Sequence, residues 1–301
     1  MIDGKNSSEN CKKPLKRIAA IHDLSCFGRC ALTVVMPALS AMGYQVIPVP
    51  TALLSSHTGG GFTDMYFKDL TQDMREVSDH FDRLELKFDA IYTGFLGSEE
   101  QIDIVLDFIK RFSDEDTLIF VDPVMGDDGV LYSTYTDRLG DRMKELCAVA
   151  DIITPNLTEA CFLSGEDYRD ISNCDEAEAF AYADRLREKL TGLGQGKIII
   201  TGIPHVGDMF GTYGHTENEF SDGYMYSVKR VRKSYPGTGD LFASVLLGCI
   251  MAGDELGDAM RFASDYICRV MNYSARFDTP VREGVAFERF MSELAEHNGG
   301  R

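Results

Sequence analysis

The sequence contains no long apolar run. No stretch approaches the ~18 uncharged apolar residues of a membrane-spanning helix, so we expect no membrane as a partner. Residues 1–16 are polar, mixed in charge and without an apolar signal core, which predicts a flexible leader and not a targeting peptide. Hydrophobic residues still make up 44% of the chain, a share typical of a protein that buries a full core.

Closely paired cysteines are also absent. None of the eight cysteines stands in a Cys-x-x-Cys pair. Cys26 and Cys30 have the spacing of half a metal site, but no second Cys/His pair completes it, so a structural zinc at this pair is not expected. Reduced, mostly buried thiols are typical of cytoplasmic proteins, and the cytoplasm is the location that we predict.

Positive charge is in short supply. The chain has 30 Lys and Arg against 48 Asp and Glu, which gives a formal net charge of -18. Such a chain repels the phosphate backbone of nucleic acids, so no nucleic acid is expected as a partner. A small phosphorylated ligand is not excluded, because helix dipoles and a metal ion can neutralise it locally.

Two common nucleotide-binding signatures are missing. The sequence has no Gly-x-x-x-x-Gly-Lys-Ser/Thr, so it is not expected to be a P-loop enzyme. No Gly-x-Gly-x-x-Gly follows the first predicted strand, which argues against a dinucleotide-dependent dehydrogenase.

Short apolar runs alternate with longer amphipathic ones. The alternation predicts a three-layer α/β/α fold with a central, mostly parallel sheet, because strand–helix–strand units place parallel strands side by side between helices. Strands are expected at 17–21, 44–49, 90–93, 117–121, 152–154 and 197–201. Helices are expected at 31–42, 71–86, 99–112, 136–149, 175–190, 240–252 and 256–274. Two alternating runs, 209–213 and 224–231, predict an antiparallel hairpin at one edge. We find no linker or repeat, so 17–301 is predicted to be a single domain.

A glycine-rich loop opens the helix predicted at 240–252. In Gly237-Thr238-Gly239-Asp240 two glycines flank a threonine and an acid follows. The unpaired N–H groups at such a helix start, with the positive end of the helix dipole, form an anion site. A carboxylate beside a bound anion suggests a base, and hence phosphoryl transfer to a hydroxyl. The alternative is a glycine-rich turn with an aspartate in the first helical turn, where aspartate is favoured anyway.

Other polar residues follow the predicted strands, and in a parallel sheet the carboxyl ends of the strands meet at one edge. Asp122 and Asp127 could bind a hard cation, and a polar turn is the alternative. Asn156 and Glu159 start a helix, where Glu159 could hold Mg²⁺ through water; helix capping fits the same pair.

A second group of candidates could contact the molecule that accepts the phosphoryl group. His57 lies in a loop with the run 59–61, all glycine, which can approach a ligand or move as a lid; a structural histidine is the alternative. Asp23 ends the first strand and could bond a ligand hydroxyl or ring nitrogen. Phe95 could stack on an aromatic ring, and a core position is the alternative. The candidates together fit in-line phosphoryl transfer: Mg²⁺ near Asp122 and Glu159 would shield the phosphates, and the N–H groups of Gly237 to Asp240 would stabilise the transferring group. Asp240 would take the proton of the acceptor hydroxyl.

These motifs resemble those of the vitamin B6 kinase branch of the ribokinase superfamily, over about 17–271. The matching stretches are Gly237-Thr238-Gly239-Asp240, Asp122-Pro123-Val124-Met125-Gly126-Asp127, Thr154-Pro155-Asn156-Leu157-Thr158-Glu159, Ser56-His57-Thr58 and Thr93-Gly94-Phe95-Leu96-Gly97. The first is specific in this position, and all five occur in order. The resemblance implies a ribokinase-like fold and an ATP-dependent kinase that salvages a B6 vitamer.

The resemblance also implies roles for single residues. Asp240 would deprotonate the 5′-hydroxyl of pyridoxal, pyridoxine or pyridoxamine, and Gly237, Thr238 and Gly239 would form the anion hole. ATP would lie against Asp122, Tyr132, Thr154, Asn156, Thr201 and Gly202, with Mg²⁺ held at Asp122, Asp127 and Glu159. The B6 pocket would contain Asp23, Ser56, His57, Thr58 and Phe95. Family members are usually homodimers and often also use K⁺.

One position departs from the family. Many pyridoxal kinases have a serine where this chain has Asp23, and an acid there could select a protonated ring nitrogen or a more cationic amine. The related hydroxymethylpyrimidine kinases of thiamine synthesis are the alternative, although the glycine-rich run that they usually carry after the first strand is absent. A non-catalytic B6- or nucleotide-binding regulator is a third hypothesis, and it has no need of a base at Asp240.

Overall fold

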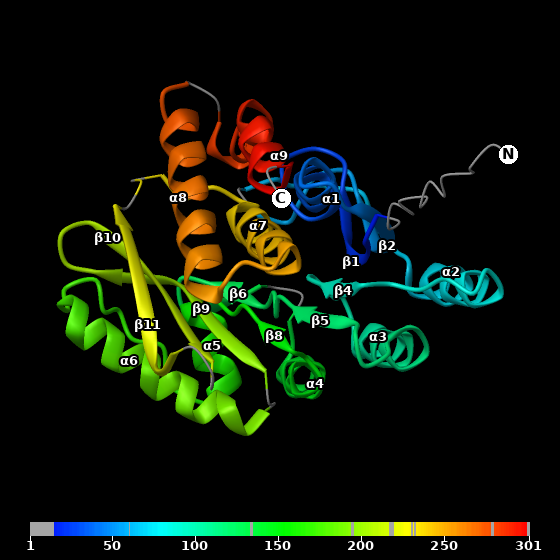
Figure 1. Cartoon of the computed structure of the whole chain (residues 1–301), viewed down its shortest axis with the longest axis horizontal. Coiled ribbons are helices and arrows are strands. Elements are labelled where there is room, and N and C mark those ends of the chain that lie inside the picture. Colours follow the sequence, from blue (N-terminus) through cyan, green and yellow to red (C-terminus); the bar gives the residue numbers. More distant parts are fainter. Residues whose placement is uncertain are drawn as a thin grey trace, which may run out of the picture.

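A nine-stranded sheet forms the middle of the molecule (Figure 1). The computed structural model describes residues 15–59, 61–132, 135–193, 196–216, 220–229, 231, 233–277 and 280–299. The flexible leader predicted at 1–16 therefore lies outside the described residues, apart from Leu15 and Lys16. In spatial order the strands are β11 (Phe220–Lys229), β10 (Met209–Thr216), β9 (Lys197–His205), β8 (Ile152–Ile153), β5 (Leu118–Val121), β4 (Ala90–Thr93), β1 (Arg17–Ser25), β2 (Gln45–Leu54) and β3 (Phe67–Asp69).

The six inner strands run parallel, from β9 to β2. The hairpin β10–β11 closes one edge antiparallel to β9, as predicted, and β3 closes the other edge antiparallel to β2, which was not predicted. A separate two-stranded hairpin, β6 (Gly126–Asp127) and β7 (Val130–Leu131), follows β5. The predicted mostly parallel sheet with an antiparallel hairpin is confirmed.

Helices cover both faces of the sheet (Figure 1). One face carries α1 (Leu32–Ala41), α7 (Thr238–Ala252), α8 (Leu256–Ser274) and α9 (Met291–Gly299). The other face carries α2 (Thr71–Arg83), α3 (Glu99–Phe112), α4 (Asp137–Ala148), α5 (Leu157–Ser164) and α6 (Glu176–Leu190). Short 3₁₀ turns lie at Thr191–Leu193, Val281–Glu283 and Phe287–Phe290.

The core has two parts, one on each face, and β1 shows how they are divided. Ile18 and Ala20 belong to the cluster beneath α1, α7 and α8, whereas Ala19 and Ile21 belong to the cluster beneath α2 to α6. A strand with both faces covered has a continuous apolar sequence, which is why the sequence signal for β1 was clear. Helix α7 is also buried nearly all round, and its residues from Leu241 to Cys249 are all inaccessible or almost so.

Three strands extend beyond their predicted ends. β1 continues to Ser25, β2 to Leu54 and β9 to His205. The apolar pattern stops earlier because the added residues at this end include polar side chains, while the backbone pairing continues, for example between Ser25 and Leu54. The predicted helices agree with the structure within a few residues, and α9 was not predicted.

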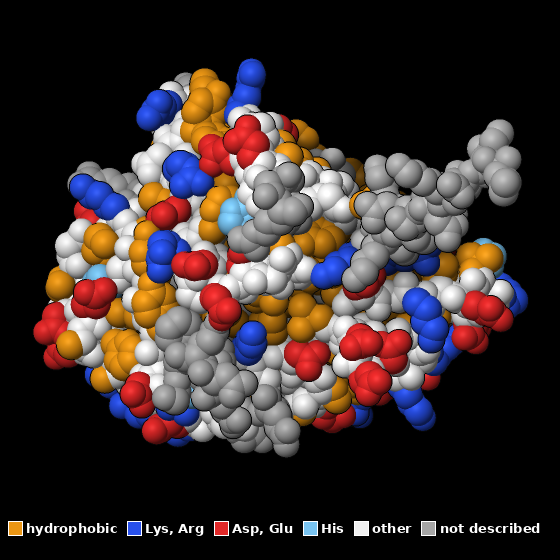
Figure 2. Space-filling view, in the orientation of Figure 1, with side chains coloured by type: hydrophobic (Ala, Val, Ile, Leu, Met, Phe, Trp, Pro, Cys, Tyr) orange, Lys and Arg blue, Asp and Glu red, His pale blue; other side chains and the backbone are white. Residues whose placement is uncertain are grey.

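Charged side chains of both signs lie on the surface of the molecule. On the face drawn in Figure 2, basic side chains are scattered among acidic ones. Among the described residues no helix has both the length and the apolarity to cross a membrane. None of the described cysteines forms a disulfide.

Candidate active site

The strand order reverses between β1 and β4. From β1 the chain moves to β2 on one side, and later to β4, β5, β8 and β9 on the other. Crevices form at such switch points, outside the carboxyl ends of the strands, and ligands bind there in open α/β sheets. Asp23 lies near the end of β1 and Phe95 just after β4, whereas Asp122 and Thr154 follow β5 and β8. The fold therefore brings the predicted site residues to one edge.

A cavity of about 150 Å³ lies at this edge, beside the start of α7. Eleven of its lining residues are among those predicted from the sequence: Asp122, Asp127, Tyr132, Thr154, Asn156, Glu159, Thr201, Gly237, Thr238, Gly239 and Asp240. Gly202 does not line it, and neither do the substrate-side residues Asp23, Ser56, His57, Thr58 and Phe95. The structure therefore brings the residues of the predicted nucleotide side and of the predicted catalytic loop together in one cavity.

The first turn of α7 has the features of an anion site. Gly237 is the N-cap in a left-handed conformation, with φ 76°, and no side chain caps the helix. The first helical bond, from the N–H of Leu241, reaches the carbonyl of Gly237 at 3.0 Å. The preceding turn leaves the N–H groups of Thr238, Gly239 and Asp240 outside the helical ladder, at the cavity.

Asp240 is held by a backbone group at the start of α1. Its Oδ2 accepts a hydrogen bond from the N–H of Ala31 at 2.8 Å. Burial raises the pKa of Asp240, and the Ala31 bond and the nearby His57 oppose the rise. A carboxylate whose pKa is raised is a stronger base than an exposed aspartate, which suits proton abstraction from a hydroxyl.

Ala31 itself has an unusual backbone. As N-cap of α1 it adopts φ 48° and ψ -135°, a region that residues with a side chain rarely occupy. Gly237 packs directly against this segment, since a Cβ at Gly237 would collide with the carbonyl oxygen of Arg29. The start of α1 therefore packs closely against the start of α7, and this contact places the N–H of Ala31 at the carboxylate of Asp240. No sequence signal points to the donor at position 31, because a backbone N–H is common to nearly every residue type.

Two further carboxylates line the cavity. Asp122 is 6% exposed, and its pKa is raised well above the usual range by burial and then by the negative charges of Glu159 and Asp240. Burial also raises the pKa of Glu159 to about 8, against the effect of its backbone hydrogen bonds. Clustered carboxylates with raised pKa values bind a cation favourably, because the cation relieves their repulsion. The all-oxygen donor set fits Mg²⁺.

Glu159 also caps α5. Its Oε2 accepts from the N–H of Asn156 at 2.7 Å, and the side chain of Asn156 accepts from the N–H of Glu159 at 3.0 Å. Its Oε1 accepts from the N–H of Met125 at 3.0 Å. The capping interpretation is therefore correct. The Glu159 carboxylate is thus fixed by backbone groups at the cavity, where it can reach a cation through a bridging water.

The hairpin β6–β7 carries Asp127 to the rim of the cavity. The amide of Asn156 donates to the carbonyl of Gly126 at 2.8 Å, and the hydroxyl of Thr158 accepts from the N–H of Gly129 at 2.8 Å. The start of α5 therefore fixes the hairpin. Asp127 is exposed as a residue, but its carboxyl group is partly desolvated. This desolvation, and then the negative charge of Asp128, raise the pKa of Asp127. Tyr132, 38% exposed, follows this hairpin.

Asp23 belongs to the predicted substrate side. Burial raises the pKa of Asp23 to about 7, and a hydrogen bond from the hydroxyl of Ser25 at 2.8 Å opposes the rise. Asp23 also lies close enough to Asp240 for the charge of Asp240 to raise its pKa. The neighbouring His22 is fully buried against Tyr92, and burial lowers its pKa to about 3. Gly94 must be glycine because a Cβ there would collide with His22. The end of β4 can therefore approach β1 closely.

His57 is connected to the C-terminal part of the chain. Its Nδ1 accepts from the N–H of Gly59 at 3.1 Å, and its Nε2 lies 2.7 Å from the carbonyl oxygen of Arg282, to which it donates. Ser56 is buried, Phe95 is partly exposed and Thr58 is exposed. The predicted glycine lid includes residue 60, which lies outside the described residues. The contact with Arg282 joins residues 225 apart, and no local sequence signal could reveal it.

Fold and site together define a ribokinase-like small-molecule kinase. Residues 69–282 match the phosphomethylpyrimidine kinase family. The chain therefore belongs to this family, and within the superfamily to the pyridoxal kinase branch. The solved structure of a putative phosphomethylpyrimidine kinase from Bacteroides thetaiotaomicron, in a crystal form with pyridoxal, is 39% identical over 93% of this chain and 96% of that one, with a TM-score of 0.84.

Two curated relatives are similar at lower identity. The pyridoxine/pyridoxal/pyridoxamine kinase of Bordetella avium is 28% identical over 84% of each chain. The pyridoxal kinase of Bos taurus is 29% identical over 69% of each chain. The predicted resemblance to vitamin B6 kinases is confirmed.

Proposed function

We propose that the protein transfers the terminal phosphoryl group of ATP to the 5′-hydroxyl of a vitamin B6 vitamer. Its relatives make it a phosphotransferase with an alcohol group as acceptor. One observation carries the proposal: an oriented carboxylate, Asp240, stands beside the uncapped start of α7 in a cavity. A pure binding protein has no need of this base.

In the proposed reaction Asp240 takes the proton of the 5′-hydroxyl as the oxygen attacks the γ-phosphorus. The new O–P bond forms while the bond from that phosphorus to the bridging oxygen breaks, and ADP leaves. The N–H groups at Gly237 to Asp240 stabilise the charge on the transferring group. Asp122 and Glu159 would hold Mg²⁺, which shields the phosphates; Asp127, at the rim, would contact its waters.

The remaining residues are assigned either to ATP or to the vitamer. Tyr132, Thr154, Asn156, Thr201 and Gly202 are proposed to contact ATP, and all but Gly202 line the cavity. Asp23, Ser56, His57, Thr58 and Phe95 are proposed to contact the vitamer. K⁺ dependence, a homodimer and a cytoplasmic location complete the proposal.

A hydroxymethylpyrimidine kinase is the second candidate, because both the matching family and the Bacteroides protein carry the phosphomethylpyrimidine name. The pyridoxal in the crystal form of the Bacteroides protein favours the first candidate.

One assay separates the candidates. Purified protein is incubated with Mg-ATP and pyridoxal, pyridoxine, pyridoxamine or hydroxymethylpyrimidine, and ADP and the phosphorylated product are quantified. We expect turnover of at least one B6 vitamer. Turnover of hydroxymethylpyrimidine alone would replace the substrate assignment. Vitamer binding without any ADP formation would support a regulator.

A further inference from the structure

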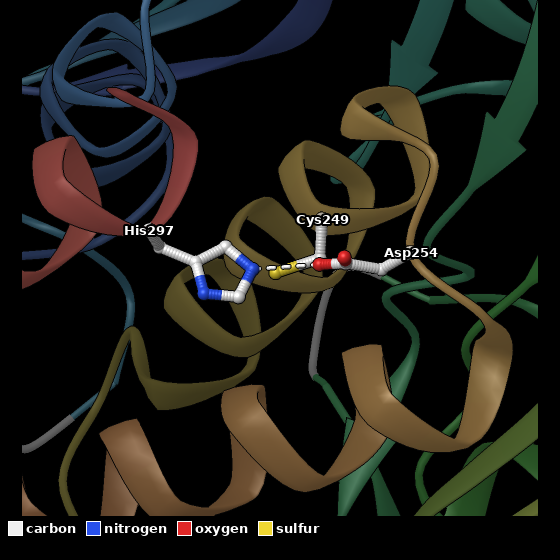
Figure 3. Close-up of side chains that lie close together, drawn as sticks. All are labelled: Cys249, Asp254 and His297. Atoms are coloured by element: carbon white, nitrogen blue, oxygen red, sulfur yellow. Dashed lines mark hydrogen bonds and ion pairs between the residues drawn. The ribbon is translucent and has the colours of Figure 1, made fainter. Parts of the chain in front are cut away.

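Three side chains with metal-binding atoms meet at the far end of α7 (Figure 3). Cys249 lies in the last turns of α7, Asp254 in the turn that follows it and His297 on α9. One ligand atom from each lies within 4.8 Å of the other two. His297 Nε2 is 2.6 Å from Asp254 Oδ2. The three belong to neither the cavity nor the substrate side described above.

Local structure explains why these groups converge. Gly253 ends α7 in a left-handed conformation, with φ 96°. This turn directs the N–H of Asp254 back to the carbonyl of Cys249 at 3.1 Å, which brings the two side chains to one side of the helix end. The ring of His297 stacks on Phe262 of α8, with centroids 3.9 Å apart. The backbone bond thus places Cys249 and Asp254, and the ring contact orients His297, as in a preorganised site.

A catalytic cysteine is the first alternative, and the geometry argues against it. In a Cys–His–Asp relay the two ring nitrogens face different partners. Here the nitrogen that bonds Asp254 is also the one on the side of the sulfur (Figure 3). Cys249 is also 0% exposed, so its sulfur presents no surface to an organic substrate.

A simple His–Asp ion pair is the second alternative. It accounts for His297 and Asp254, whose side chains are 20% and 3% exposed. The sulfur of Cys249 adds a third metal-binding atom within 4.8 Å of both groups, which a pair of residues does not offer. A thiolate, a carboxylate and a neutral imidazole carry two negative charges, which a divalent ion cancels, and charge balance matters most where the groups are buried.

We propose that Cys249, Asp254 and His297 bind one divalent ion of the zinc class, with water as the fourth ligand. Sulfur and imidazole nitrogen favour zinc or cobalt over Mg²⁺ and Ca²⁺. Binding releases the thiol proton to solvent. The bonds would be about 2.3 Å to sulfur and about 2.0–2.2 Å to nitrogen and oxygen, so the side chains need only separate slightly around the ion.

The ion would act as a structural clamp. It would tie α9 to the end of α7, and Cys249 follows Asp240 by nine residues, about 13 Å along the helix. We therefore expect it to stabilise the fold without entering phosphoryl transfer. The proposal does not depend on the proposed function.

The test uses full-length protein without a histidine tag, loaded with Zn²⁺ and then dialysed against metal-free buffer. Elemental analysis should find one zinc per chain. Zinc at a hundredfold excess over Kd should raise Tm by about 5 °C. Co²⁺ in its place should give a thiolate charge-transfer band in the near-ultraviolet, which reports a metal–sulfur bond directly.

Cys249→Ala is the decisive variant, because it removes the sulfur and keeps the His297–Asp254 bond. It should lose the zinc, the Tm shift and the cobalt band, and His297→Ala should do the same. Cys174→Ala is the matched control and should keep all three. Zinc retained at full stoichiometry by Cys249→Ala, or no zinc retained by the wild type, would overturn the proposal.

Discussion

The two ends of α7 hold ionisable groups in opposite arrangements. At the start of the helix, Asp240 receives a backbone N–H from Ala31, beside an open cavity and other acids. At its end, Asp254 is bonded to His297, and Lys16 Nζ donates to the carbonyl of Met251 at 2.6 Å. The helix dipole favours anions at the start and cations at the end. On the proposed function, the same helix serves a reaction at its start and the attachment of neighbouring segments at its end.

The difference concerns stability as well as charge. Acids with raised pKa values crowd the start of α7, so ionising them costs free energy in the folded state. At the far end, by contrast, the Asp254 carboxylate is bonded to an imidazole and the Lys16 ammonium to a carbonyl. We therefore expect substitutions of these acids to change activity or relieve charge repulsion, and substitutions of the bonded groups at the far end to loosen the fold.

The largest effect is expected for Asp240→Asn. The amide cannot accept the hydroxyl proton, so kcat should fall ~10²–10⁴-fold while the fold is kept. Steady-state kinetics with the preferred vitamer measures it. Asp258→Asn is the matched control, because Asp258 is the third residue of α8 as Asp240 is of α7, and it is exposed. A near wild-type rate for Asp240→Asn would show that Asp240 is not the base.

Asp23→Asn should stabilise the protein. The pKa of Asp23 is about 7 in the fold against 3.8 unfolded, so the native state binds the proton more tightly between these values. Its contribution to stability therefore falls as pH rises through this range. Removing the charge should add up to about 4 kcal/mol to the free energy of unfolding at pH 8 and nothing below pH ~4.

Denaturant unfolding at both pH values tests this prediction. A gain of the same size at both would contradict it, because the effect would then not come from ionisation. Comparison of kcat/KM for the three vitamers between Asp23→Asn and the wild type also tests whether Asp23 sets vitamer preference.

Gly237→Ala should destabilise the start of α7 by about 1–3 kcal/mol, because of its positive φ, and by more if the contact with Arg29 cannot relax. Gly239→Ala is the matched control for the fold, since its Cβ would meet no atom within 4 Å. We expect Gly239→Ala to keep the unfolding free energy of the wild type. It should raise KM for ATP, because the methyl group enters the proposed phosphate site. Equal unfolding free energies for the two variants would contradict the steric argument.

The smallest effect is expected at the other end. In metal-free protein, His297→Ala should cost about 1–2 kcal/mol of unfolding free energy by removing the imidazole that bonds Asp254. Its kcat should stay within twofold of wild type well below Tm. His80→Ala, an exposed histidine on α2, is the control. A large loss of kcat without a loss of stability would mean that the two ends of α7 are coupled.

Residues with a local signal in the sequence come together in the structure. The loop at Gly237 to Asp240 and the acids after β5 are marked by glycine and charge at the end of an apolar run, and they line one cavity. The contacts that sequence reasoning missed join distant segments: Ala31 with Asp240, His57 with Arg282 and His297 with Asp254. Such pairs depend on tertiary packing, and a backbone donor or acceptor leaves no trace in the residue type.

The hydrogen bond from Ala31 to Asp240 does not depend on the side chain at position 31. Because the group that orients Asp240 is a main-chain amide, every residue except proline supplies it. A scan of side chains at position 31 would report the tolerance of a strained backbone and miss the hydrogen bond altogether. The orientation of the Asp240 carboxylate is thus inherited with the path of the chain, and it persists through sequence changes that preserve that path.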